Sequence, residues 1–185
     1  DLKNRELPKG TIHPENLAKD LKELRFYPGE ITEAHILPFI PKAAELDLED
    51  KATQKRLNAF AKVLAENTSV HAAATRLMRT TEWDFMAVYY DMIDHFCHGF
   101  MKFHPPKLPQ IPEKLYDYYH QVIVGAYRFQ DMMLERILDL IGEETTVMLM
   151  SDHGYESANK RILKMPKYPA APALEHRKFG IFVAS

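Results

Sequence analysis

An acid and an imidazole stand side by side directly after an apolar run, at Asp152 and His153. Carboxylate and imidazole side chains are donors that zinc, manganese and iron accept as ligands. The run 145–150 before them has the length and the flanking glycines of a buried, central parallel strand. Open α/β sheets bind ligands at the carboxyl ends of such strands. We therefore expect Asp152 and His153 to be metal ligands at a strand end.

A second group of metal-binding residue types follows another apolar run, at 85–90. It contains two pairs with a spacing of four, Asp91 with His95 and Asp94 with His98. On a helix, side chains four residues apart share a face, so either pair could hold one ion. A single pair of this kind is also typical of a surface ion pair.

His176 and Cys97 are weaker candidates when each is taken alone. His176 precedes the last apolar run, 179–184, in a polar stretch where a histidine is usually a solvated loop residue. Cys97 could be a soft ligand, but a lone thiol is more typical of a small buried residue. Together with the acid and imidazole pairs, however, His176 completes a set of oxygen and nitrogen donors at three strand ends, which favours a transition-metal site.

The elements that would position these residues are expected in the second part of the chain. The three apolar runs predict strands, and the spacing of apolar residues over 113–141 predicts one long helix. The order strand, helix, strand outlines a right-handed crossover. A loop of about 27 residues, long enough to carry function, joins the last two strands. Three strands are too few for a doubly wound sheet, so we expect this chain to be a fragment of a longer protein.

The first part of the chain shows helical spacing in place of strand patterns. We expect its helices from Pro14, over 32–40, over 48–65, and from the capping residues Asn67-Thr68-Ser69 onward. The sequence therefore predicts two regions. Residues 1–81 form an all-helical insert or cap, and residues 82–185 form the C-terminal part of an α/β domain.

Composition excludes several classes of partner. The chain has 24 basic and 26 acidic residues, and its formal charge of -2 gives no electrostatic reason to expect a nucleic acid or an anionic membrane. No segment approaches the roughly 20 apolar residues that a membrane-spanning helix needs. One cysteine excludes an intrachain disulfide framework and leaves the compartment open. We expect a small-molecule substrate.

Three ordered segments resemble the type I phosphodiesterase and nucleotide pyrophosphatase family of the alkaline phosphatase superfamily. They are the run 84–98, which ends in Asp-x-x-x-His, the Asp152-His153-Gly154 turn, and Glu175-His176 before the last run. The order and spacing of these segments agree over roughly residues 83–185. The resemblance implies an α/β fold, with a partial alkaline-phosphatase-like sheet flanked by helices.

The resemblance also implies roles for individual residues. Asp94, His98 and His176 would hold one divalent ion, and Asp152 and His153 would contribute to a second. Zinc is the expected metal and manganese the alternative. Two ions about 4 Å apart would clamp the attacking and leaving oxygens of an in-line displacement at phosphorus.

In the family a Thr or Ser nucleophile forms a covalent intermediate, and this nucleophile and a further aspartate ligand lie upstream of the segments above. We expect them outside this chain. The hydroxyl residues of the first part stand in helical or capping contexts and are not assigned the role: Thr32, Thr53, Thr68 and Ser69.

The resulting functional prediction is metal-dependent hydrolysis of phosphodiester or nucleotide pyrophosphate bonds. Two alternatives stay open: a related phosphomonoesterase, sulfatase or phosphomutase, and a noncatalytic helical interaction module with an incomplete or structural metal site. Asp91 with His95 also remains an alternative ligand pair, although the resemblance favours Asp94 with His98, because the distance from Tyr89 to Asp94 matches the one that the family leaves between the aromatic residue of the strand and the ligand. The basic residues to be tested for phosphate binding are Lys160, Arg161 and Arg177.

Overall fold

Helices make up most of the structure, and the strands are short. The computed structural model describes residues 8–167 and 171–185. The α-helices are α1 (Ala18–Glu23), α2 (Glu33–Ile36), α3 (Lys51–Thr80), α4 (Met92–Phe100), α5 (Glu113–Tyr119) and α6 (Val122–Leu140). The strands are β1 (Met148–Met150), β2 (Gly154–Tyr155), β3 (His176–Arg177) and β4 (Phe182–Ala184). Single-turn helices connect them, among them η5 (Met101–Phe103), η6 (Ala158–Lys160) and η7 (Ala171–Glu175).

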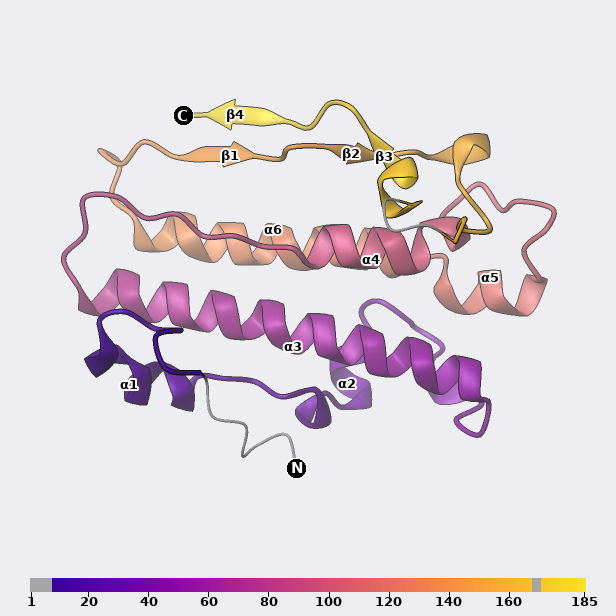
Figure 1. Ribbon diagram of the computed structural model, residues 1–185, viewed down its shortest axis with the longest axis horizontal. Coiled ribbons are helices and arrows are strands. Elements are labelled where there is room, and N and C mark those ends of the chain that lie inside the picture. The colour runs from indigo at the N-terminus through magenta and orange to yellow at the C-terminus, as the bar shows by residue number, and fades with distance from the viewer. Residues whose placement is uncertain (1–7, 168–170) are drawn as a thin grey trace.

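These elements lie in layers (Figure 1). The strands lie on one side of α4 and α6, which pack against each other. Helix α3 lies on the opposite side of this pair and contacts both of its members. The short helices α1 and α2 lie beyond α3. Helix α4 is therefore enclosed between α3 and the strands, with one face toward each.

Helix α3 begins where Asp50 caps it. The Asp50 carboxylate accepts hydrogen bonds from the backbone N–H and from the hydroxyl of Thr53, both at 2.8 Å. The hydroxyl bond first, and then the backbone bond, lower the pKa of Asp50. Capping of this kind satisfies one of the N–H groups that the first turn of a helix leaves without a partner.

The predicted start of a new helix at Asn67-Thr68-Ser69 is wrong, because α3 runs through these residues without a break. The hydroxyls of Thr68 and Ser69 donate to carbonyl oxygens four residues earlier, at 2.8 and 2.7 Å. They therefore bond back into the same helix and do not cap a new one. Asn67 is buried, and its amide donates to the sulfur of Met133 on α6 at 3.4 Å. Packing against α6 thus overrides the local capping preference.

The predicted single helix over 113–141 is also wrong, because α5 and α6 are separated at His120 and Gln121. The His120 Nδ1 atom lies 3.0 and 3.2 Å from the carbonyl oxygens of Tyr116 and Asp117. The imidazole thus lies against the last turn of α5, where the backbone N–H of His120 also donates to the Tyr116 carbonyl, at 2.9 Å. Four members of the predicted apolar stripe are buried: Tyr119, Val122, Ala126 and Met133.

The predicted strand over 85–90 is not formed in the described chain. The segment is extended but joins neither of the two sheets. Phe85 and Tyr89 are each 81% exposed, while the hydroxyl of the half-buried Tyr90 lies 2.9 Å from the Nδ1 atom of His71 on α3. A strand needs a neighbour for its backbone hydrogen bonds. The described residues provide none for this segment.

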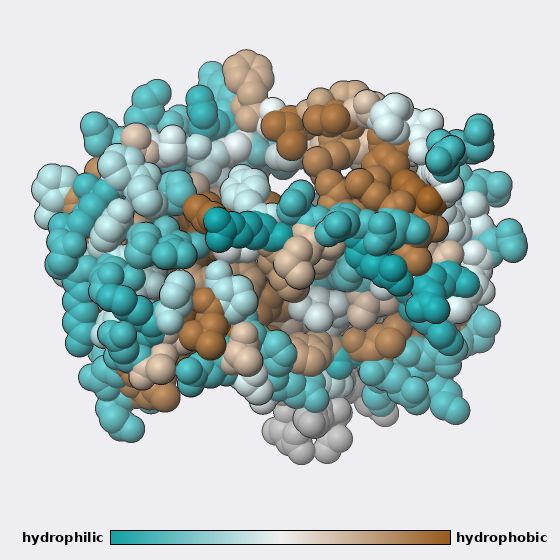
Figure 2. Space-filling model, turned by 180° about the vertical axis from the view of Figure 1, so that it is seen from behind, coloured by the Kyte–Doolittle hydropathy of each residue, from teal (hydrophilic) through white to brown (hydrophobic). Residues whose placement is uncertain are grey.

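The strand predicted over 145–150 is present as β1, but neither its burial nor its parallel pairing is found. Strand β1 pairs antiparallel with β4, and Leu149 stands opposite Val183. All residues of both strands are exposed. This sheet has only two strands in the described chain, and because successive side chains point to opposite faces, both of its faces are open. Figure 2 shows apolar side chains gathered at the upper right of the rear face, on the side of β1 and β4.

The long loop predicted between the last two strands contains ordered elements. Strand β2 pairs antiparallel with β3, and Tyr155 stands opposite His176. The result is a mixed helix and strand fold, consistent with the predicted α/β class, in which two small antiparallel sheets accompany a helical core.

One hydrophobic core joins the two predicted regions. Phe60 of α3 stacks on Phe96 of α4 with ring centroids 4.7 Å apart, and Phe39 contacts both rings edge-on. The core then continues through Phe100 to Tyr119. Residues on both sides of position 81 therefore share the same buried surface. The division into 1–81 and 82–185 stays a prediction.

Over the described ranges, none of the helices has the length and apolar character needed to span a bilayer. The longest, α3, carries polar and charged residues along its whole length.

Gly125 on α6 is required by close packing. A Cβ atom at this position would lie 2.9 Å from the Cα of Phe39, and a backbone atom cannot move aside as a flexible side chain can. We predict that Gly125→Ala destabilises the fold by about 1–3 kcal/mol, the usual cost of overpacking a core. Urea unfolding followed by circular dichroism measures this change.

Gly99→Ala is the matched control. Gly99 also lies in a helix, but a Cβ atom there would meet nothing within 4 Å. Replacing a helical glycine by alanine normally stabilises by about 0.5–1 kcal/mol. Equal effects of the two substitutions would contradict the packing described here.

Candidate metal centre

Three side chains from two distant segments converge above α4. Asp94 and His98 project from the same face of α4, one turn apart, and His176 comes from β3. Each offers a ligand atom, and these atoms all lie within 4.8 Å of one another. The Nε2 atoms of His98 and His176 are 3.1 Å apart, and each lies 3.7 Å from a carboxylate oxygen of Asp94.

These separations suit a divalent ion. Zinc is held at about 2.0–2.2 Å by imidazole nitrogen and carboxylate oxygen, so ligands of one tetrahedral ion lie about 3–4 Å apart. The donor atoms of Asp94, His98 and His176 have this spacing, and the three residues are half-buried. The chemistry of the donor set, two nitrogens and a carboxylate, fits zinc or manganese.

His153 lies against this group. Its ring stacks on that of His176 with centroids 3.7 Å apart and an interplanar angle of 12°, and its Nε2 atom lies 3.6 Å from the Asp94 carboxylate. Asp152 lies at the rim with its side chain 91% exposed, and its carboxylate is 3.8 Å from the same Nε2 atom. Four of the five predicted site residues thus form one connected group, and the fifth borders it.

The α4 helix explains why Asp94 and His98 are available. Its apolar side, which includes Met92, Phe96 and Phe100, is buried against α3 and α6. Asp94 and His98 lie on the side turned toward β2 and β3, because residues four apart share a face. The same helix therefore anchors the core and presents the two ligand candidates.

The charge state of His176 favours metal binding. Burial first, and then the neighbouring imidazoles of His153 and His98, lower the pKa of His176. A lowered pKa keeps the ring neutral at physiological pH, and only the neutral imidazole can donate a lone pair to an ion.

Tyr155 supports the site but was not expected from the sequence. Its hydroxyl donates to the Asp94 carboxylate at 2.5 Å and lies 3.0 Å from the Asp94 carbonyl oxygen. Burial, followed by this hydrogen bond, raises the pKa of Tyr155. Its position one residue after Gly154 gave no signal, because only the pairing of β2 with β3 places Tyr155 beside His176.

Glu175 is the second supporting residue that sequence reasoning missed. Its carboxylate lies 2.6 Å from the Nδ1 atom of His98, and its side chain is 13% exposed. The one available signal was its place directly before His176.

The alternative ligand pair, Asp91 with His95, lies at the start of α4 and apart from the candidate centre. The His95 Nε2 atom is 3.3 Å from the Asp91 carboxylate, and both side chains are well exposed, at 50% and 39%. Neither residue belongs to the group of converging donors found among the described residues.

Cys97 is 1% exposed within the core, and burial raises the pKa of its thiol to about 12. It is therefore a protonated, enclosed side chain.

Gly180 fixes the turn that carries Asp152 and His153. A Cβ atom at Gly180 would overlap the carbonyl group of Ser151. Only glycine therefore fits at this position, where the chain passes the turn just before β4. The backbone N–H of Ser151 donates to the Ile181 carbonyl at 2.9 Å. The turn is thus held to the last strand immediately before the predicted ligands.

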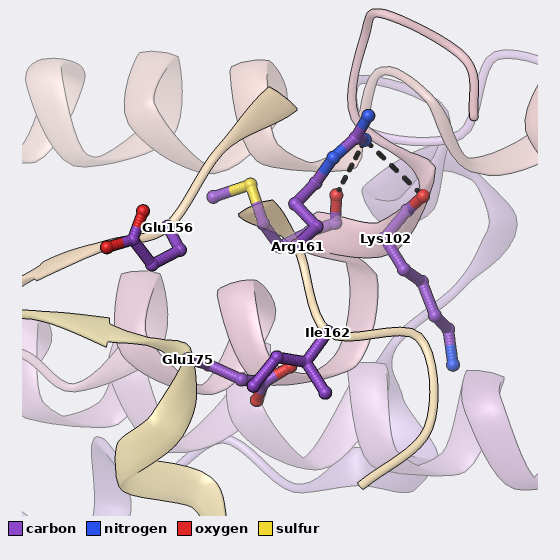
Figure 3. A pocket seen from close by; sticks show the side chains of 6 residues that line it. Lys102, Glu156, Arg161, Ile162 and Glu175 are labelled. Carbon is purple, nitrogen blue, oxygen red and sulfur yellow. Dashed lines mark hydrogen bonds between the residues drawn. The ribbon is translucent and has the colours of Figure 1, made fainter. Parts of the chain in front are cut away.

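The side chain of Arg161 is hydrogen-bonded to backbone carbonyl groups. Its guanidinium donates to the carbonyl oxygens of Met101 and Lys102, at 3.2 and 3.4 Å (Figure 3). Further bonds reach the carbonyl oxygens of His104 and Pro106. Arg161 is only 6% exposed, so these bonds replace water for a buried charge. It is therefore a structural residue and not a free phosphate ligand. Lys160 and Arg177 are exposed and stay candidates.

The cavity beside Arg161 is small. Glu156, Ile162 and Glu175 line it together with Arg161 and residues of η5 (Figure 3). Its volume is about 10 Å³, which holds one water molecule at most. A phosphate ester does not fit there.

The hydroxyl residues of the first part are all engaged in local structure. Thr53 donates to Asp50, Thr68 and Ser69 bond back within α3, and the Thr32 hydroxyl lies 3.1 Å from His35. These contacts agree with leaving the role of nucleophile unassigned among them.

Fold and site together define a helix-rich α/β protein with a cluster of histidines and an aspartate between a helix and a small sheet. A comparison with protein-family models matches residues 8–183 to the type I phosphodiesterase / nucleotide pyrophosphatase family. The match covers nearly the whole chain, and the chain belongs to this family. Searches of curated proteins and of solved structures found no match.

The role of Arg161 gives a test. We predict that Arg161→Met lowers the free energy of unfolding by about 1–3 kcal/mol, because several carbonyl groups lose their hydrogen-bond donor. Chemical denaturation measures the loss. Lys160→Met is the control, since Lys160 is exposed, and it should change stability by less than about 0.5 kcal/mol. An Arg161 variant as stable as the unmodified chain would contradict this assignment.

Proposed function

We propose that this chain contributes the metal centre of an enzyme that hydrolyses phosphodiester or nucleotide pyrophosphate bonds. Asp94, His98 and His176 would hold one divalent ion, and Asp152 and His153 would contribute to a second. The observation that carries the proposal is the convergence of the first three residues from segments 78 positions apart in a member of this family.

Asp94 is the residue that connects the two groups. One oxygen of its carboxylate faces His153 and His176, at 3.6 and 3.7 Å, and the other faces His98 at 3.7 Å. Asp152 lies on the open side of His153, where a second ion would be reached by solvent and substrate. This arrangement supports two neighbouring ions, zinc in the first place and manganese as the alternative.

When bound, a pair of divalent ions supplies charge neutralisation for the attacking and leaving oxygens of an in-line displacement at phosphorus. The residues of this chain do the positioning. Tyr155 holds the Asp94 carboxylate, and the core side of α4 holds both Asp94 and His98 against displacement. A covalent Thr or Ser intermediate belongs to the proposal, with its nucleophile supplied from outside the described residues.

We also propose that segment 85–90 and β1 belong to an alkaline-phosphatase-like sheet. Phe85 and Tyr89 are exposed on the first, and Met148 and Met150 are exposed on the second. Large apolar side chains in contiguous exposed positions are typical of surfaces that another element covers. Both segments lead directly into the candidate centre, at α4 and at Asp152.

Metal binding is the first test. We predict that Asp94→Ala and His176→Ala each weaken zinc binding by more than the ~10–100-fold that loss of a supporting residue typically costs. Titration of the chain with zinc in competition with a coloured chelator measures the affinity. Asp91→Ala is the matched control, because Asp91 lies on the same helix outside the converging group. A larger loss for Asp91→Ala than for Asp94→Ala would contradict the proposed ligand set.

Catalysis is tested on the protein that contains this chain. We predict zinc- or manganese-dependent hydrolysis of a nitrophenyl phosphodiester, measured by release of nitrophenolate. Asp152→Ala and His176→Ala should each abolish it, since each removes a proposed ligand. Turnover that survives both substitutions would refute the catalytic role and leave the noncatalytic alternative.

A further inference from the structure

Glu175 and His176 are neighbours in sequence but face different parts of the site. His176 is on β3 and directs its Nε2 atom toward Asp94 and His98. Glu175 ends η7 and directs its carboxylate to the opposite edge of the His98 ring, where it lies 2.6 Å from the Nδ1 atom. The His98 imidazole is thus held between two consecutive residues.

The contact fixes where the hydrogen of His98 lies. An ionised carboxylate can only accept hydrogen bonds, so the Nδ1 atom of His98 must be the protonated nitrogen at this distance. The Nε2 atom of a neutral ring then carries a free lone pair. That lone pair points to the place where the donor atoms of Asp94 and His176 converge.

The contact between Glu175 and His98 is largely shielded from water. The side chain of Glu175 is 13% exposed and that of His98 is 24% exposed, so water competes weakly for either group. A charge-assisted hydrogen bond between partly buried groups is stronger than a neutral one. The backbone of Glu175 is held as well, because its carbonyl oxygen accepts from the N–H of Glu156 at 2.8 Å. The Glu175 carboxylate therefore extends from a backbone that is itself held in place.

From this geometry we infer that Glu175 is a positioning residue for the metal centre: it holds His98 with Nδ1 protonated and Nε2 directed at the ion. The inference rests on the proposed function, because it assumes that His98 is a ligand. It goes beyond the ligand set by assigning a role to a residue that contacts no ion. The Glu175-His176 dipeptide then supplies one ligand and orients another.

The test uses all 185 residues of the chain. Zinc affinity is measured by chelator competition for the unmodified chain, Glu175→Ala and Glu175→Gln. We expect Glu175→Ala to bind zinc about 10–100-fold more weakly, and Glu175→Gln to lose less, because its amide oxygen can still accept from Nδ1. Glu156→Gln is the matched control, since Glu156 lines the same small cavity, and it should bind zinc as the unmodified chain does.

A second readout reports on His98 directly. Long-range proton–nitrogen NMR spectra of the metal-free chain distinguish the two neutral forms of histidine, and comparison with His98→Asn assigns the signal. We expect the Nδ1-protonated form in the unmodified chain and a mixture of forms in Glu175→Ala. A change limited to general folding would alter many signals and would also appear in the circular dichroism spectrum.

Each outcome separates the two proposals. If the unmodified chain binds zinc and Glu175→Ala binds it equally tightly, or if His98 is protonated on Nε2 in the metal-free chain, the role of Glu175 is refuted while the ligand set stands. If the unmodified chain binds neither zinc nor manganese, the ligand set itself is refuted, and the role of Glu175 fails with it.

Discussion

The packing of α4 is the constraint on which the candidate centre depends. Phe96 stacks on Phe60 at a centroid distance of 4.7 Å, and it lies between Asp94 and His98 in the sequence. The aromatic core therefore fixes the position of α4 and its rotation about its own axis. Because α4 cannot rotate without unpacking this core, its polar side must face β2 and β3.

The strand side of the centre is held by different means. There the pairing of Tyr155 with His176 places a phenol and an imidazole together, and Glu175 and Gly180 fix the segments on either side. Few of these residues reach the core, so hydrogen bonds and a close glycine contact take the place of apolar packing. A helix held by core packing thus faces a small two-stranded sheet held mainly by hydrogen bonds, and the proposed metal ligands lie between the two.

The residues that converge at the candidate centre could be named from the sequence more accurately than the elements around them. The spacing of Asp94 and His98 requires only one turn of helix, and the apolar runs beside His153 and His176 indicated these two residues before the family pattern assigned them roles. The break at His120 and the continuous α3 were missed, because each depends on a contact that local preference does not contain: the imidazole at the end of α5, and Asn67 against Met133. Burial of β1 was wrongly expected because a run of apolar residues indicates a strand but not the layers that cover it. Glu175 and Tyr155 could not be found by pattern, since both act across a pairing of segments far apart in sequence.

The central claim is that Asp94, His98 and His176 bind one ion. Diffraction from crystals of the chain grown with zinc, measured at the zinc absorption edge, locates that ion directly. We expect an anomalous peak about 2.0–2.2 Å from the Nε2 atoms of His98 and His176 and from a carboxylate oxygen of Asp94. A peak held by Asp91 and His95, with none beside Asp94, would contradict it.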